Sequence, residues 1–99
     1  MQGQIQFDNN YTLDASGAIV FETIDSILDS WKQITSLIID LPKVNISCSN
    51  LEIIDSSFMA FLIEVKRFCN QHGVRFSITG LGDEKQDFLS AYGVLDVLS

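Results

Sequence analysis

The chain has 99 residues, the length of one domain, and 46% of them are hydrophobic, as in a globular protein. Its formal charge of −7, from 13 acidic and 6 basic residues, opposes nucleic-acid binding, which needs clustered Lys and Arg, and leaves a protein as the expected partner. No apolar run is long enough to span a bilayer, and the first residues lack the layout of a signal peptide. We therefore expect a single domain over residues 1–99 that is cytoplasmic, with no direct membrane insertion.

The start of the chain predicts a β-hairpin. Polar and apolar residues alternate over 4–8 and again over 11–15, and the two asparagines at 9–10 suit a tight turn between them. The Ser-Gly pair at 16–17 is expected to end the second strand. Residues 18–21 then form a short apolar link.

A first helix is predicted after this link, and it is expected to end near Gln33 because an apolar segment follows before Pro42. Whether Leu37–Ile39 in that segment forms a strand or a packed loop stays open. The buried face of the helix is predicted from residues at three- and four-residue spacing, which are Ile24, Ile27, Leu28, Trp31 and Ile34.

The middle of the chain predicts a strand, a helix and a second parallel strand. Alternation over 44–48 and over 74–79 marks the strands, and Gly73 suits the residue that ends the helix. A single crossover helix places both strands in one sheet, with the strand at 44–48 in its interior. The core face of the helix is predicted to hold Phe58, Phe61, Leu62, Val65, Phe68 and Cys69.

The end of the chain predicts a last helix, with Asp83 as N-cap, Gln86 completing a capping box and Gly93 beyond its end. Residues 94–98 are expected to form a closing extended segment. The inward side chains are expected to be Phe88, Leu89 and Tyr92. The fold class is therefore α/β, with a mixed sheet of about four or five strands and helices mainly on one face.

No assembled catalytic or metal site is predicted, so we expect neither enzyme activity nor a cofactor. The only histidine, His72, lies at the far end of the helix that begins at Ser56, roughly 20 Å away at the α-helical rise. Cys48 and Cys69 are predicted to be small buried hydrophobes of a reducing compartment, without a disulfide or a zinc ion between them.

The residues Asp55, Ser56 and Ser57, which precede the central helix, have two interpretations. Asp and Ser are favoured N-caps, because their side-chain oxygens accept from unpaired backbone N–H groups, and a cap alone explains them. The alternative is a binding site, since loops at the carboxyl ends of parallel strands collect ligands and partners.

The segment NLEIIDSSFMAFL, from Asn50 to Leu62, resembles the signature of STAS domains, the family of anti-sigma-factor antagonists and their relatives. The segment from Gly73 to Leu81 resembles the next strand of that family. Two residues depart from the pattern. Phe58 stands where the family usually has Gly, and Ser47 stands near the position where an aspartate often ends the central strand of the family. The resemblance implies a STAS-like mixed sheet.

The segment from Gly17 to Ile24 resembles the MlaB-like branch, whose members are small cytoplasmic STAS subunits of the Mla phospholipid ABC transporter. That resemblance implies a non-catalytic protein that binds the ATPase subunit, supports its assembly and activity in outer-membrane lipid asymmetry, and is peripheral to the inner membrane through this partner. The alternative is an anti-sigma factor antagonist regulated by phosphorylation of Ser56, the residue directly after the aspartate. Phe58 favours the subunit, because Gly would permit the closer backbone approach of a kinase.

The central helix is also expected to carry the partner-binding surface. Met59 and Ile63 lie one turn apart beside the core stripe, where they either extend the core or form a hydrophobic anchor pair. The complete predicted partner-binding set is Asp55, Ser56, Ser57, Met59, Ala60, Ile63, Glu64 and Arg67.

Overall fold

The computed structural model describes residues 2–94 and residue 98, and it confirms an α/β fold with a mixed four-stranded sheet and three helices. The strand order is β1-β2-β3-β4, with β1 antiparallel to β2 and the other neighbours parallel. The elements in chain order are β1 (Gln4–Phe7), β2 (Thr12–Ile19), α1 (Ile24–Ile38), β3 (Lys43–Ile54), α2 (Ser56–His72), β4 (Arg75–Thr79) and α3 (Asp83–Ala91).

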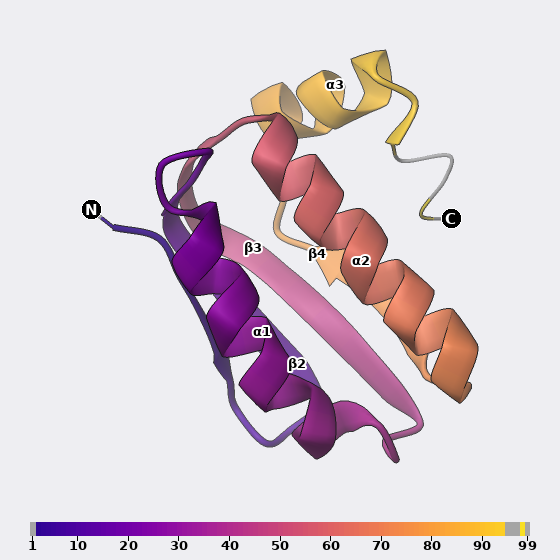
Figure 1. Cartoon of the computed structure of the whole chain (residues 1–99). Coiled ribbons are helices and arrows are strands. Elements are labelled where there is room, and N and C mark those ends of the chain that lie inside the picture. The colour runs from indigo at the N-terminus through magenta and orange to yellow at the C-terminus, as the bar shows by residue number, and fades with distance from the viewer. Residues whose placement is uncertain (1, 95–97, 99) are drawn as a thin grey trace.

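Helices α1 and α2 run side by side over one face of the sheet, and α3 lies near the end of β3 (Figure 1). The predicted interior position of residues 44–48 is confirmed, because β3 pairs with both β2 and β4. On the sheet, Asn45 hydrogen-bonds through its side chain to Thr79 at 2.8 Å and to Ser77 at 2.9 Å. These polar residues are typical of a sheet face that contacts water.

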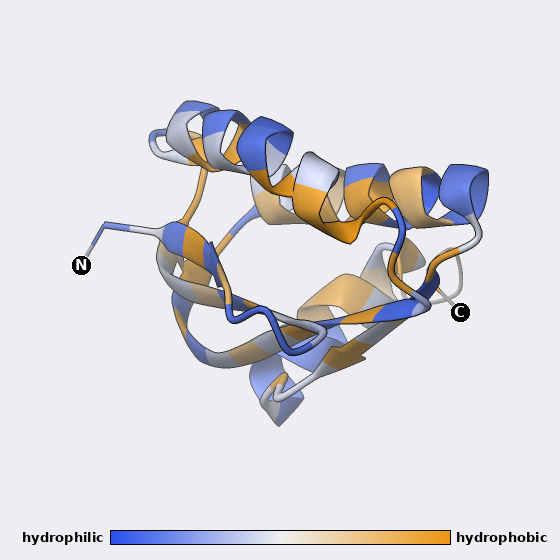
Figure 2. Ribbon diagram, turned by 90° about the horizontal axis from the view of Figure 1, so that it is seen from below, coloured by the Kyte–Doolittle hydropathy of each residue, from blue (hydrophilic) through white to orange (hydrophobic). Residues whose placement is uncertain are grey.

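The core lies between the helical layer and the sheet, where Figure 2 shows hydrophobic segments facing each other and hydrophilic segments on the outer side of the helices. Alternate strand residues such as Leu13 and Ile46 are fully buried, as are Phe58 and Phe61 on α2. Phe58 therefore packs inward, as its place on the apolar stripe predicted.

Strand β2 does not end at the Ser-Gly pair, so that prediction was wrong. It continues to Ile19, because the pair accommodates register shifts rather than a break. Gly17 has φ +72°, and a Cβ there would lie 2.5 Å from the carbonyl oxygen of Gln2. Glycine at this position therefore lets the strand bulge while the backbone of Gln2 and Gly3 passes close by.

Two further boundaries differ from the sequence prediction. Helix α1 does not end near Gln33 but continues to Ile38, whose side chain is buried at 0% exposure one turn beyond Ile34. The open segment Leu37–Ile39 is thus the end of a helix and its cap, not a strand. Strand β3 extends to Ile54, beyond the predicted 44–48.

The end of the chain departs most from the prediction. Gly82, not Asp83, is the N-cap of α3, and no side chain caps this helix. Leu89 is buried, but Tyr92 is 68% exposed and does not face inward. The predicted extended segment falls largely on residues 95–97, which lie outside the described residues, and Val94 before them is helical and buried. No helix in the described part of the chain is both long and apolar enough to cross a bilayer.

Candidate protein-interaction site

Asp55 is the single residue between β3 and α2, and it caps the helix as the sequence predicted. Its backbone is extended, and its Oδ1 accepts a hydrogen bond from the Ser57 N–H at 2.8 Å. This satisfies one of the N–H groups that the first turn leaves without a helical partner. At the other end, Gly73 ends the helix in the left-handed conformation with φ 70°.

The second oxygen of Asp55 reaches a distant part of the chain. Its Oδ2 accepts from the backbone N–H of Phe21 at 3.0 Å, in the loop between β2 and α1. That loop is also fixed from within, because the Thr23 hydroxyl donates to the Ala18 carbonyl at 2.8 Å and accepts from the Val20 N–H at 3.1 Å. One carboxylate therefore joins the two loops that follow the neighbouring parallel strands.

This junction leaves an aromatic side chain in solvent. Phe21 is 77% exposed although its backbone is tied to Asp55, and Ser56 beside Asp55 is also exposed. We call Phe21, Asp55 and Ser56 the loop surface. The sequence singled out the last two of these residues but missed the contact with Phe21. The sequence held no direct signal for this contact, because it depends on the parallel pairing of β2 and β3, which brings the ends of both strands to the same edge of the sheet.

The other predicted partner-binding residues are divided between the core and the surface. Met59 is only 6% exposed, so it extends the core and is not an exposed anchor. Ile63 is half-buried, and Arg67 is exposed with its guanidinium 3.4 Å from the Glu64 carboxylate. Partner binding by this surface remains a prediction.

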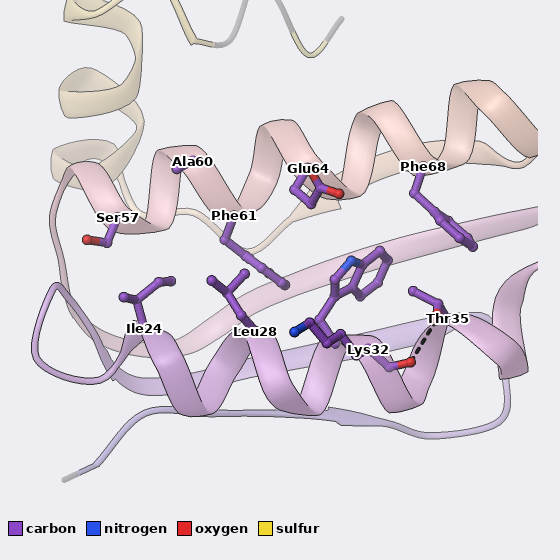
Figure 3. Close-up of a pocket in the computed structure, with 10 residues that line it drawn as sticks. Ile24, Leu28, Lys32, Thr35, Ser57, Ala60, Phe61, Glu64 and Phe68 are labelled. Carbon is purple, nitrogen blue, oxygen red and sulfur yellow. Dashed lines mark hydrogen bonds between the residues drawn. The ribbon is translucent and has the colours of Figure 1, made fainter.

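A groove of about 670 Å³ runs between α1 and α2. Figure 3 shows Ile24 and Leu28 of α1 directed toward α2, with Phe61 and Phe68 of α2 directed toward α1. The Trp31 ring fills the space between the helices, edge-to-face with Phe61 at 6.0 Å and Phe68 at 5.5 Å between ring centroids. The complete lining is Ile24, Leu28, Trp31, Lys32, Thr35, Ser57, Ala60, Phe61, Glu64 and Phe68.

Three of the predicted residues, Ser57, Ala60 and Glu64, line this groove, and the other predicted residues do not. The groove itself was missed. The apolar stripes of both helices were visible in the sequence. The sequence did not reveal that α1 and α2 lie next to each other and leave a groove between them.

The two cysteines are free and buried, as predicted. Burial raises the pKa of the Cys48 thiol from 9.0 to about 12, with a smaller contribution from the nearby Asp14 charge. Burial likewise raises the pKa of Cys69 to about 11, against a smaller lowering effect of Lys66. Both thiols are therefore neutral at physiological pH. Among the described residues no group of three or more His, Cys, Asp or Glu side chains could hold a metal ion.

The neutral thiols make the protein sensitive to alkali. Both folded-state pKa values lie above the ordinary 9.0. The buried neutral thiols therefore make their full contribution to the free energy of unfolding below about pH 9, and this contribution is lost as the pH rises toward 11 to 12. We expect the two thiols together to lower the free energy of unfolding by about 2–3 kcal/mol between about pH 8 and about pH 10. Urea denaturation at both pH values measures this change. A Cys48→Ala/Cys69→Ala variant should lose that part of the pH dependence, and an unchanged dependence would contradict the assignment.

Comparisons with known proteins support the fold. The STAS domain model matches residues 4–99 of this chain. A search among curated proteins found no match. A solved structure described as "Crystal Structure Analysis of Mglu" is similar with a TM-score of 0.56 and 17% sequence identity, over 80% of this chain and 19% of that one. This chain thus spans a minor part of that protein's length, and the likeness shows a shared fold alone.

Proposed function

The chain belongs to the STAS domain family, and from this premise we propose that it is the small STAS subunit of an Mla-type phospholipid ABC transporter. In this role it binds the cytoplasmic ATPase subunit and supports its assembly and activity in outer-membrane lipid asymmetry. Its place is on the cytoplasmic side of the inner membrane, where the ATPase holds it. The STAS family itself supports a small protein-interaction domain.

The observation that carries the proposal is the position of Phe21. This residue belongs to the segment that resembles the MlaB-like branch, and its side chain is 77% exposed. The fold does not need the ring for its core, yet Asp55 and Thr23 fix the backbone around it. A rigidly presented aromatic side chain is the kind of group that provides much of the binding energy in protein interfaces.

The proposed role is non-catalytic. Ser56 and His72 are the first and last residues of α2, so about 24 Å of helix separates them. A serine nucleophile needs a base within hydrogen-bond reach, which this separation prevents within one copy of the chain.

One observation favours a second candidate, an anti-sigma factor antagonist switched by phosphorylation. The Ser56 hydroxyl is exposed and directly follows Asp55, and it begins a helix whose N-terminus favours a phosphate. Phe58 supports the transporter subunit instead, because its ring fills the core where the family usually has Gly.

Co-expression with the ATPase encoded by the same organism, followed by gel filtration, tests the proposal. We expect the two chains to elute together, and Phe21→Ser to weaken binding by about tenfold or more, because interface energy concentrates in a few aromatic anchors. The matched control is Tyr92→Ser, since Tyr92 is a second exposed aromatic residue, at 68%, on α3. Separate elution of the unmodified chains would contradict the transporter role. Phosphorylation of Ser56 by a captured anti-sigma kinase would establish the alternative.

A further inference from the structure

The α1–α2 groove shares no residue with the loop surface, which it adjoins at Ser57, and it has the dimensions of a short helix. Its lining runs from Ile24 to Thr35 on α1 and from Ser57 to Phe68 on α2, which is about 16 Å, or three helical turns, on each side. An amphipathic helix fits such a groove with apolar side chains at positions i, i+3, i+4 and i+7.

The groove offers apolar surface that the domain does not cover. Ile24, Leu28 and Phe68 pack against the core but remain only half-buried. Below them the Trp31 ring, 4% exposed, forms a rigid base with the aromatic rings of α2. Ala60 on the α2 side is exposed, and its small side chain leaves the groove open.

The charges beside the groove indicate the chemistry of its occupant. Asp25 and Asp29 directly follow Ile24 and Leu28 on α1, and both are exposed. On the other side Glu64 lines the groove, with Arg67 beside it. Lys32 is the one basic residue among the described lining residues. In or beside the groove, three acidic residues therefore stand against two basic ones, and Glu64 is paired with Arg67. This small negative excess on a chain of net charge −7 opposes a second copy of the same chain and an anionic lipid, and it attracts a basic partner.

We propose that the α1–α2 groove binds an amphipathic helix of a protein partner, with Lys or Arg residues of that helix beside Asp25 and Asp29. This inference rests on the proposed protein-binding role and adds a second contact surface to it. The apolar side chains of the partner helix contact Leu28 and Phe68, above Trp31.

Trp31 is the only tryptophan of the chain, so its fluorescence reports on the groove directly. The probe is a synthetic amphipathic peptide of about 14 residues with Leu on one helical face and Lys on its flanks. A counterpart with Glu in place of each Lys is the control. We expect the Lys peptide to change the Trp31 emission saturably, and the Glu peptide to bind about tenfold more weakly or not at all.

Two double variants of the full chain distinguish binding in the groove from non-specific electrostatic attraction between the Lys peptide and the acidic protein. Asp25→Lys/Asp29→Lys changes the groove edge, and Asp83→Lys/Asp87→Lys changes α3. Each pair is exposed, starts in the first turn of its helix, and reduces the net charge from −7 to −3. We expect the first pair to weaken Lys-peptide binding by about tenfold and the second by less than about twofold.

Equal weakening by both pairs, or no change of Trp31 emission with the Lys peptide, would overturn the inference. Saturable binding of dodecanoate in place of the peptide would assign the groove to a small apolar acid instead. The two proposals fail separately. If the ATPase complex forms but no peptide binds, only the groove inference fails; if the peptide binds and the ATPase does not, the transporter role fails.

Discussion

Replacing Phe58 with glycine is expected to lower the free energy of unfolding by about 4–6 kcal/mol. The side chain is 0% exposed, and its ring lies 6.2 Å from that of Phe61, between centroids. Truncating a buried Phe to Ala costs about 3–5 kcal/mol, and glycine inside a helix adds about 1 kcal/mol. A domain of this size has only about 5–15 kcal/mol in total.

Urea denaturation followed by far-ultraviolet circular dichroism measures the effect. The matched control is Phe58→Leu, which keeps an apolar side chain of similar volume and should cost less than about 1.5 kcal/mol. A glycine variant that unfolds at the same urea concentration as the unmodified protein would show that Phe58 is not a core residue. The position where this chain departs from the usual STAS pattern is therefore also one that its own fold requires.

Replacing Asp55 with alanine is expected to lower the free energy of unfolding by about 2–3 kcal/mol, because the helix loses its cap and a charged acceptor is lost from the Phe21 N–H. The loop that presents Phe21 would then be free to move. We therefore expect weaker binding to the ATPase as well as lower stability, measured by titration and by urea denaturation.

Asp8→Ala is the control for this variant. Asp8 makes the same kind of contact in another loop, since its Oδ1 accepts from the Asn10 N–H at 2.7 Å and from the Thr12 N–H at 3.1 Å. It should therefore cost stability without changing partner binding. Equal binding by the Asp55 and Asp8 variants would mean that Asp55 only caps its helix.

The sequence predicted the central strand, helix and strand well because their periodicities differ sharply. Alternation at 44–48 and helical spacing from Phe58 onward both describe how side chains meet the core. The end of α1 was missed because a run of β-branched and apolar residues up to Ile39 fits a strand as well as a buried helical turn. Gly17 was taken as a strand end, although the same conformational freedom also permits a bulge.

The candidate site was only partly predictable. The cap formed by Asp55 is local, so its residue type and position sufficed. Its bond to Phe21 spans 34 residues and depends on the register of β2 and β3, which a single sequence does not reveal. Met59 lies beside the core stripe on a helical projection, but α2 packs on β4 as well as beside α1, so more of its circumference is buried.

Hydroxyl-radical footprinting of the proposed complex with the ATPase tests the central claim most directly, because it measures side-chain exposure at two matched aromatic residues. In the free protein both Phe21 and Tyr92 should be oxidised, as they are 77% and 68% exposed. In the complex we predict that oxidation of Phe21 falls several-fold while that of Tyr92 is unchanged. Protection of Tyr92 with Phe21 as reactive as in the free protein would contradict a partner-binding loop surface.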